Sequence, residues 1–213
     1  MTIPAKYFHT IRYLKPRQIV LRFWYKFTRA RPDMRLAPSR RKVASAFVRP
    51  FCPPPSMTGP TEFRFLNESR TCAEQQDWLM PRASKLWQYN LHYFDDLIAI
   101  GAEERRAWHE DLIARWTSEV APCTGVGWEP YPTSLRIVNW IKWTLRGGAL
   151  SGAATDSLAV QTRALSQRLE YHILANHLFA NAKALIFSGL FFEGKEAEHW
   201  FNKGLRLVEQ ELN

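Results

Sequence analysis

The stretch Tyr171–Phe192 constrains the fold of this chain more than any other part of its sequence. It reads YHILANHLFANAKALIFSGLFF, an almost wholly apolar run without proline. Such a run predicts a helix that is buried on most sides. Its polar members are His172, Asn176, His177, Asn181 and Lys183. Because burying an amide, an imidazole or an ammonium is costly without a partner, this helix either bonds to its neighbours or looks into a site.

The helical period divides these polar groups into two stripes. His172, Asn176 and Lys183 fall within about 40° of one another on a helix. The second stripe holds Glu170, His177 and Asn181. Adjacent side chains such as Asn176 and His177 can share a binding surface only at a helix end or beside a wide cleft.

A second candidate segment is Trp128–Trp143, with the sequence WEPYPTSLRIVNWIKW. On a helix that Thr133 or Ser134 would cap, four residues share one face. They are Arg136, Asn139, Trp140 and Trp143. A guanidinium and an amide beside indole rings suit a sugar, because aromatic rings cover its C–H face while the polar groups bind hydroxyls or a carboxylate. The same tryptophans would equally serve as core.

A third segment, Leu86–Leu97, reads LWQYNLHYFDDL and mixes aromatic rings with His92, Asp95 and Asp96. The two carboxylates are adjacent, so they point in different directions on a helix. No HxxE or HExxH spacing indicates a metal site. This segment is either structural or a general sugar contact.

The three segments together resemble the N-terminal domain of the heparinase II/III family of polysaccharide lyases, which is related to oligoalginate lyases. They occur in the family's order, the last as EYHILANHLFANAKALIFSGLFFEG. The basic opening YFHTIRYLKPRQIVLRFWYK also resembles members from bacterial surface-polysaccharide gene clusters. The resemblance implies a partial (α/α) toroid of antiparallel helix pairs, followed in the family by β-sheet domains.

The resemblance further implies β-elimination of a glycan that contains uronate, an acidic polysaccharide. Asn176 and His177 match the pair that neutralises the uronate carboxylate and are the expected catalytic residues. The expected substrate-binding residues are Arg136, Asn139, Trp140, Trp143, His172 and Lys183. No cofactor or metal is expected.

The family's catalytic tyrosine lies some tens of residues after the Asn-His motif, whereas this sequence ends at Asn213. We therefore expect an N-terminal fragment that is inactive alone, with the β domains absent or encoded separately. Tyr171 lies off the Asn176 stripe and is not expected to replace the missing base. The alternative is a non-enzymatic glycan-binding or polysaccharide-assembly protein.

Charge is distributed unevenly along the chain. Residues 1–49 hold 13 Lys or Arg and one acid, Asp33, whereas the other 164 residues hold 16 basic and 19 acidic groups. Residues 1–60 thus read as an irregular basic arm with a Pro-rich linker, and 61–213 as the helical domain. The arm could dock on the rest of the protein, or contact nucleic acid, an anionic membrane or an acidic polymer. No nucleic-acid motif supports that partner.

Helical patterns dominate from Trp78 onward and predict an all-α array. We expect helices within Leu86–Ile100, over Glu103–Val120 with Leu112, Ile113 and Trp116 inward, and from Thr133 or Ser134 to Gly147. Further helices are expected near 156–192 and over Glu196–Leu212. The alternating segment Glu62–Asn67 could form a brief strand.

Other classes find little support. Cys52, Cys72 and Cys123 are odd in number and form no CxxC pair, which argues against a disulfide framework or a zinc site. No unbroken apolar run predicts a transmembrane span. Arg22 splits the only short apolar run near the start, so no signal peptide is predicted. A cytoplasmic location follows, with the periplasm as the alternative that degradative relatives suggest.

Overall fold

The computed structural model describes residues 30–42, 51–171 and 176–212. These residues are mostly helical, which confirms the all-α prediction at the level of secondary structure. The α-helices are α3 (Lys85–Tyr93), α4 (Arg106–Glu119), α5 (Pro130–Leu145), α6 (Gly152–Gln167), α7 (Asn176–Phe191) and α8 (Lys195–Leu212). Within these ranges, no helix is both long and apolar enough to cross a membrane. Residues 1–29 and 43–50, which belong to the predicted basic arm and linker, lie outside the described part of the chain.

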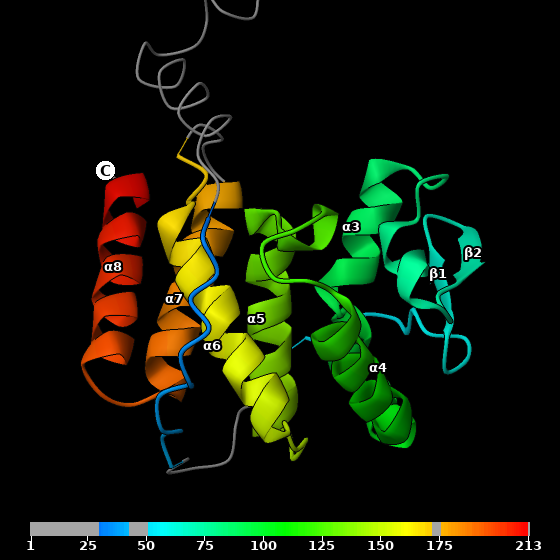
Figure 1. The fold of residues 1–213 in the computed structure, drawn as a ribbon, viewed down its shortest axis with the longest axis horizontal. Helices are drawn as coiled ribbons and strands as arrows, with labels where there is room; N and C mark the ends of the chain where they lie inside the picture. The colour runs from blue at the N-terminus through cyan, green and yellow to red at the C-terminus, as the bar shows by residue number, and fades with distance from the viewer. Residues whose placement is uncertain (1–29, 43–50, 172–175, 213) are drawn as a thin grey trace, which may run out of the picture.

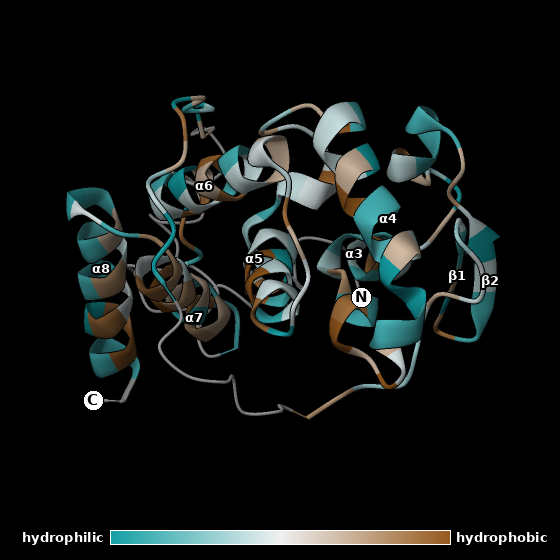
Figure 2. Ribbon diagram, turned by 90° about the horizontal axis from the view of Figure 1, so that it is seen from below, coloured by the Kyte–Doolittle hydropathy of each residue, from teal (hydrophilic) through white to brown (hydrophobic). Residues whose placement is uncertain are grey.

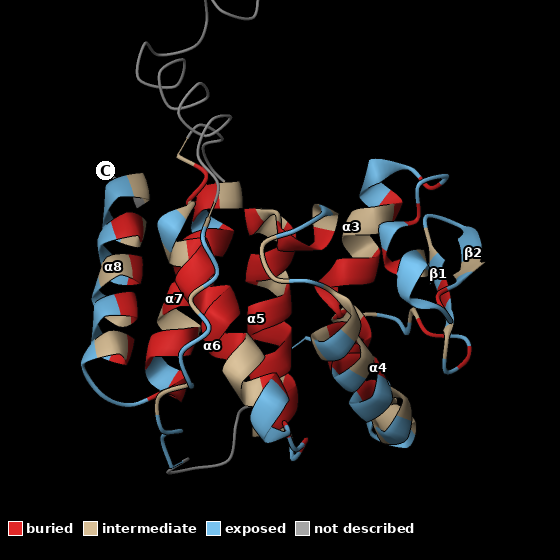
Figure 3. Ribbon diagram, in the orientation of Figure 1, coloured by how far each residue is buried: buried red, intermediate tan, exposed pale blue. Residues whose placement is uncertain are grey.

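The helices pack in two rows. In the view of Figure 2, the first row consists of α8, α7, α5 and α3. The second row lies beside it and consists of α6 and α4. In the view of Figure 1, α6 crosses in front of α5 and α7. Buried residues run through α5, α6 and α7, whereas α4 and α8 each present one exposed side (Figure 3). The centre of the core therefore lies where α5, α6 and α7 meet.

Helix α3 ends earlier than its apolar pattern indicates. Phe94 adopts a left-handed backbone with φ of 61°, and a short 3₁₀ helix follows at Asp95–Ile98. The buried Phe94 ring packs edge-on against Trp116 and Trp140, with ring centroids 6.3 and 5.6 Å away. Packing of this ring fixes the turn that sets the direction of Asp95.

Helix α5 begins before the residues expected to cap it. The predicted caps Thr133 and Ser134 are already inside the helix, which starts at Pro130 after Glu129. Proline suits a first helical position because its missing N–H has no partner there in any case and its φ is already helical. The predicted stop is confirmed, since Gly147 follows the helix with φ of 90°.

The helix within the apolar run does not include the first residue of that run. Tyr171 lies in a turn, and the described part of α7 begins at Asn176. The backbone N–H of Glu170 donates to the Asn181 side chain at 2.9 Å, which holds the turn against the helix in place of an intrahelical bond. At the other end, Phe192 pairs with Arg40 in an isolated β-bridge.

Glycines let α7 and α8 pack with their backbones close together. A Cβ atom on Gly189 of α7 would stand 2.6 Å from the backbone nitrogen of Phe201. A Cβ on Gly204 of α8 would stand 2.8 Å from the backbone oxygen of Ala182. Neither distance is compatible with a side chain, so these two positions set the spacing of the helix pair.

A small antiparallel hairpin precedes the helices. The expected strand is confirmed as β1 (Glu62–Phe65), and it pairs with β2 (Glu68–Thr71), which was not predicted. Leu66 and Asn67 join them with φ of 53° and 63°, the two positive values that a tight hairpin turn requires. Phe65 packs edge-on against Trp87 of α3, with ring centroids 5.1 Å apart. The hairpin is thereby fixed to the outer end of the helical array.

Residues 30–42, here called the strap, run extended across α6 and the junction of α7 with α8. Arg163 of α6 donates to the backbone oxygens of Arg35 and Leu36 at 2.6 and 3.1 Å. The strap's Arg41 N–H donates to the oxygen of Phe191 at 2.8 Å. This part of the basic arm therefore docks on the helices. Docking on the rest of the protein was one of the possibilities given for the arm above.

The α7–α8 spacing gives a test of this packing. We expect Gly189→Ala to lower the free energy of unfolding by about 1–3 kcal/mol, because the added methyl has to push two backbones apart. Gly152→Ala is the matched control, since a Cβ on Gly152 meets nothing within 4 Å. Urea unfolding of both variants measures the difference, and equal stabilities would contradict the close packing.

Candidate functional site

The site begins at His177, near the start of the described part of α7. Its Nδ1 lies 3.2 Å from Oε1 of Glu170, and its ring stacks on Tyr131 with centroids 4.2 Å apart. The side chain remains 30% exposed. Because Nδ1 faces the protein, Nε2 is the ring nitrogen left to meet a ligand.

Glu170 is held in place by Asn181. The Asn181 amide nitrogen donates to Oε2 of Glu170 at 3.3 Å and to Oγ of Ser134 on α5 at 3.0 Å. Asn181 is fully buried, and its oxygen accepts the Glu170 backbone N–H. One buried amide thus ties the turn, α5 and α7 together, and orients the carboxyl that holds His177.

Glu170 sits in an environment that disfavours its charge. Burial raises the pKa of its carboxyl above the usual value, the hydrogen bonds from His177 and Asn181 oppose that rise, and the nearby Glu129 adds to it. Only 5% of Glu170 is exposed. A hydrogen shared between Glu170 and His177 is therefore favoured over a bare buried carboxylate.

Asn176 lies directly beside this pair. It is exposed, whereas the neighbouring His177 is partly buried. The two adjacent side chains thus both reach the surface, the arrangement that the sequence allows only at a helix end or beside a wide cleft. The structure brings the two predicted catalytic residues together on an accessible surface.

Three tyrosines extend the site toward α3. Tyr131 meets Tyr93 edge-on at 5.8 Å, and Tyr93 lies 6.3 Å from Tyr89. The Tyr89 hydroxyl donates to the carboxylate of Glu129. Burial, together with Tyr131, Asp95 and Glu170, raises the pKa of Tyr93 above its usual range. These rings form an aromatic wall beside His177.

Glu170, Tyr93 and Tyr131 were not among the predicted site residues. Tyr131 and Tyr93 lie inside two segments that the sequence singles out, and Glu170 shares a helical stripe with His177. The sequence thus singled out each of the three segments, but it gave no indication that residues from all three meet at one site.

Most of the predicted α5 contacts lie in the core. Arg136 and Trp140 are fully buried, and Trp143 is 4% exposed. The expectation that these three residues contact a glycan is corrected, because they have no surface from which to do so. The alternative of a core role is the one the structure shows.

Asn139 of α5 and Lys183 of α7 are the other two predicted binding residues that the structure describes. The Asn139 amide donates to Oδ1 of Asp95 at 2.8 Å and to the oxygen of Tyr93 at 2.9 Å. Lys183 is half-buried and within electrostatic range of Asp95. Asn139 is itself buried, so it positions Asp95 and does not face solvent. The predicted binding residue His172 lies outside the described residues.

The remaining polar groups of the third segment are structural. His92 accepts from the Trp116 indole at 3.2 Å, and its other ring nitrogen lies 3.1 Å from the oxygen of Trp78. Burial lowers the pKa of His92 to about 3, and the charge on Arg136 adds to this effect. Asp96 bonds the buried His109 at 2.9 Å. Both groups are fully occupied in holding the fold.

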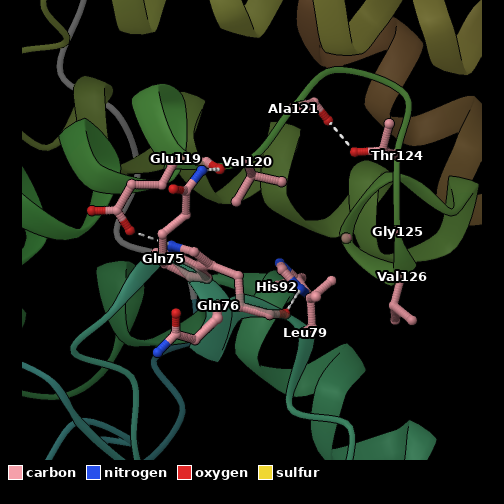
Figure 4. A pocket seen from close by; sticks show the side chains of 12 residues that line it. Gln75, Gln76, Leu79, His92, Glu119, Val120, Ala121, Thr124, Gly125 and Val126 are labelled. Atoms are coloured by element: carbon pink, nitrogen blue, oxygen red, sulfur yellow. Dashed lines mark hydrogen bonds between the residues drawn. The ribbon is translucent and has the colours of Figure 1, made fainter.

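A separate pocket of about 330 Å³ lies between residues 75–79 and 119–127 (Figure 4). His92 forms part of its lining, with both ring nitrogens already bonded. None of the predicted catalytic or substrate-binding residues lines it. Across the described ranges, no three His, Cys, Asp or Glu side chains are grouped to hold a metal ion.

Comparison of the chain with protein-family models, curated proteins and solved structures finds no match. Any function assigned to it therefore rests on the chemistry of the residues around His177.

A pH series tests the state of Glu170. Since its pKa is raised in the folded protein, its favourable contribution is present below about pH 4.5 and is lost as the pH rises through the raised value. Glu170→Gln removes this loss, so the stability of the variant relative to the original chain should increase with pH over that window. Urea unfolding at several pH values measures it, with exposed Glu198→Gln as the control. A difference that does not change with pH would refute the assignment.

Arg136 is tested by Arg136→Lys. A lysine cannot span the acceptors of the buried guanidinium, so we expect a loss of about 3–5 kcal/mol in unfolding free energy. Exposed Arg206→Lys should change stability little. If Arg136→Lys were stable but bound glycan more weakly, the core role of Arg136 would be contradicted and a role in glycan binding supported.

Proposed function

We propose that this chain binds an acidic, uronate-containing polysaccharide at the surface formed by Asn176 and His177. The observation that supports the proposal is the pairing of buried Glu170 with His177, directly beside exposed Asn176. Two hydrogen-bond donors on one accessible surface can hold a carboxylate. Tyr89 and Tyr131, the two half-buried rings of the aromatic wall, offer the kind of surface on which a sugar ring packs.

Such a surface fits the first requirement of β-elimination. The hydrogen at C5 of a uronate is weakly acidic, and donors on the adjoining carboxylate stabilise the charge that develops when it leaves. A base then takes the C5 hydrogen, the C4–O bond breaks, and its electron pair goes to the glycosidic oxygen, which accepts a proton. A C4=C5 double bond remains in the product.

In this proposal Glu170 sets the hydrogen-bonding state of His177. When the two groups share one hydrogen and Nε2 of His177 carries another, the pair is neutral overall and Nε2–H can donate to the substrate. The raised pKa of Glu170 favours retention of that hydrogen. The Asn176 amide supplies the second donor.

The three tyrosines of the aromatic wall are poor candidates for the base that takes the C5 hydrogen. The Tyr89 hydroxyl is bonded to Glu129, and the pKa of Tyr93 is raised. Tyr131 lies stacked against the His177 ring. We therefore propose that the chain alone binds its glycan with little turnover, since a site that lacks a proton-transfer group, as the described part of this one does, loses about 10²–10⁴-fold of rate.

We further propose that the two rows of helices are part of an (α/α) toroid. Support comes from the neighbouring contacts of α3 with α5 and of α5 with α7 in one row, and of α4 with α6 in the other. The β-sheet domains that the resemblance implies would then act as partners of this helical part.

The proposal is tested with the purified full chain and short oligomers of uronate. We expect Asn176→Ala to weaken binding by roughly 10-fold in calorimetry, because it removes a hydrogen bond to a charged group. Asn202→Ala, an exposed asparagine on α8, should bind as the original chain does. Ultraviolet absorbance of the unsaturated product reports turnover in the same samples.

Each alternative has its own outcome. Efficient product formation by this chain would refute the expected inactivity. Binding that is unchanged in Asn176→Ala, with no turnover, would favour a non-enzymatic glycan-binding or polysaccharide-assembly protein.

A further inference from the structure

The strap is held on the helices by contacts to its backbone. The Ala37 N–H donates to Oδ1 of Asp156 at 2.7 Å. The Arg31 N–H donates to Oε1 of Gln167 at 3.1 Å, and the Gln167 amide nitrogen donates back to the Arg31 oxygen at 3.3 Å. Together with the bonds from Arg163 to strap oxygens, these contacts fix the course of the chain. They hold the strap without using its apolar side chains.

Two large apolar side chains project from this anchored backbone. Met34 is 64% exposed and Leu36 is 80% exposed, on a segment whose surface is mostly exposed (Figure 3). In an extended segment residues two apart point to the same side, so both side chains lie on one face. At the end of the strap, Leu190 of α7 is also exposed, and its backbone oxygen accepts from Nε of Arg41 at 3.1 Å. Apolar side chains grouped on a polar surface mark a contact with another molecule.

Basic side chains accompany the apolar ones. The strap contains five basic residues and one acid, namely Arg31, Arg35, Arg40, Arg41, Lys42 and Asp33. Asp33 is paired with Arg35 at 2.7 Å, and the adjoining Glu196 is paired with Arg163 at 2.8 Å. Glu193 adds an exposed acid at the end where Arg40, Arg41 and Lys42 lie. The face keeps a positive balance, which favours an anionic partner.

The sequence directly before the strap has the same chemistry. Residues 1–29 contain seven Lys or Arg, seven Phe, Trp or Tyr, and no Asp or Glu. Aromatic and basic side chains together are typical of segments that bind a membrane surface, because the rings enter the headgroup region and the cations attract anionic lipids. The charge and the apolar character of the strap thus continue a pattern that begins at the start of the sequence.

The two apolar side chains favour a membrane over a soluble polyanion. Sugars and nucleic-acid bases pack on flat aromatic rings, whereas Met34 and Leu36 carry flexible aliphatic chains. Such chains lower their free energy when they enter the boundary between lipid headgroups and acyl chains. A polysaccharide or a nucleic acid would contact the cations but would leave these two side chains in water.

We propose that the strap docks one face of the protein on an anionic lipid surface. Met34 and Leu36 insert between the lipids, and the basic side chains of the strap contact the anionic headgroups. Because helices α6, α7 and α8 hold the backbone of the strap, the protein binds with this side of the helical array toward the membrane (Figure 1). The inference goes beyond the proposed glycan binding and does not depend on it, since it uses neither Asn176 nor His177.

The test measures flotation of the full chain with vesicles of phosphatidylcholine, alone or mixed with phosphatidylserine. We expect binding to the mixed vesicles that weakens with added salt, and little binding to the neutral ones. The double variant Met34→Ser with Leu36→Ser should bind the mixed vesicles roughly 10-fold more weakly, because less apolar surface leaves the water. Leu86→Ser, an exposed leucine of α3, is the matched control.

Two further variants test the charge. Arg31→Gln and Lys42→Gln should each weaken binding to the mixed vesicles by about 5-fold. Exposed Arg64→Gln on β1 should change it little. The replaced side chains are exposed, so all variants should keep the melting temperature of the original chain. Weaker vesicle binding that occurs only where the melting temperature falls would overturn the proposal.

Other results would also decide the matter. Vesicle binding that the double serine variant leaves unchanged, or that is equal for neutral and mixed vesicles, would overturn membrane docking. Binding of heparin or duplex DNA that depends on Arg31 and Lys42, without vesicle binding, would assign the strap to a soluble polyanion instead. Asn176→Ala should bind vesicles as the original chain does, so failure of the glycan site and failure of membrane docking are distinguished.

Discussion

The architecture depends on one buried guanidinium. Arg136 of α5 donates to the oxygens of His92 and Gly127 at 3.1 and 2.8 Å, and to Gln161 of α6 at 2.9 Å. Its charge lies 3.9 Å from the centre of the Trp116 ring on α4. Burial lowers the pKa of Arg136 well below its usual value. Since the cost of burying this group is offset only while all four neighbours are in place, it links α3, α4, α5 and α6.

A second contact connects the core around Arg136 to the candidate site. Ser134 lies two residues before Arg136 and accepts from Asn181, which in turn orients Glu170. His177 is therefore placed by a chain of hydrogen bonds that starts in the core. The polar groups of the apolar run thus serve two purposes: Asn181 specifies packing, whereas Asn176 and His177 reach the surface. The two predictions for that run, bonds to neighbouring helices and side chains that face a site, therefore apply to different residues.

Periodicity predicted the helices well where a helix buries one side. The inward positions Leu112, Ile113 and Trp116 of α4 are confirmed, because the pattern of burial along one helix is local information. The pattern failed at Arg136 and Trp140, since it shows which residues share a face but not what covers that face. It also missed the early start of α5, where backbone geometry at Pro130 outweighed the capping preference of Thr133.

The sequence by itself determined the helical class, the uneven charge and the unusual polar groups within an apolar run. It also placed Asn176 and His177 side by side. Only the tertiary structure decided that Glu170 and Tyr131 join His177. The physical reason is that the helical period sets the angle of a side chain about its own axis, whereas helix packing decides which other helix it meets.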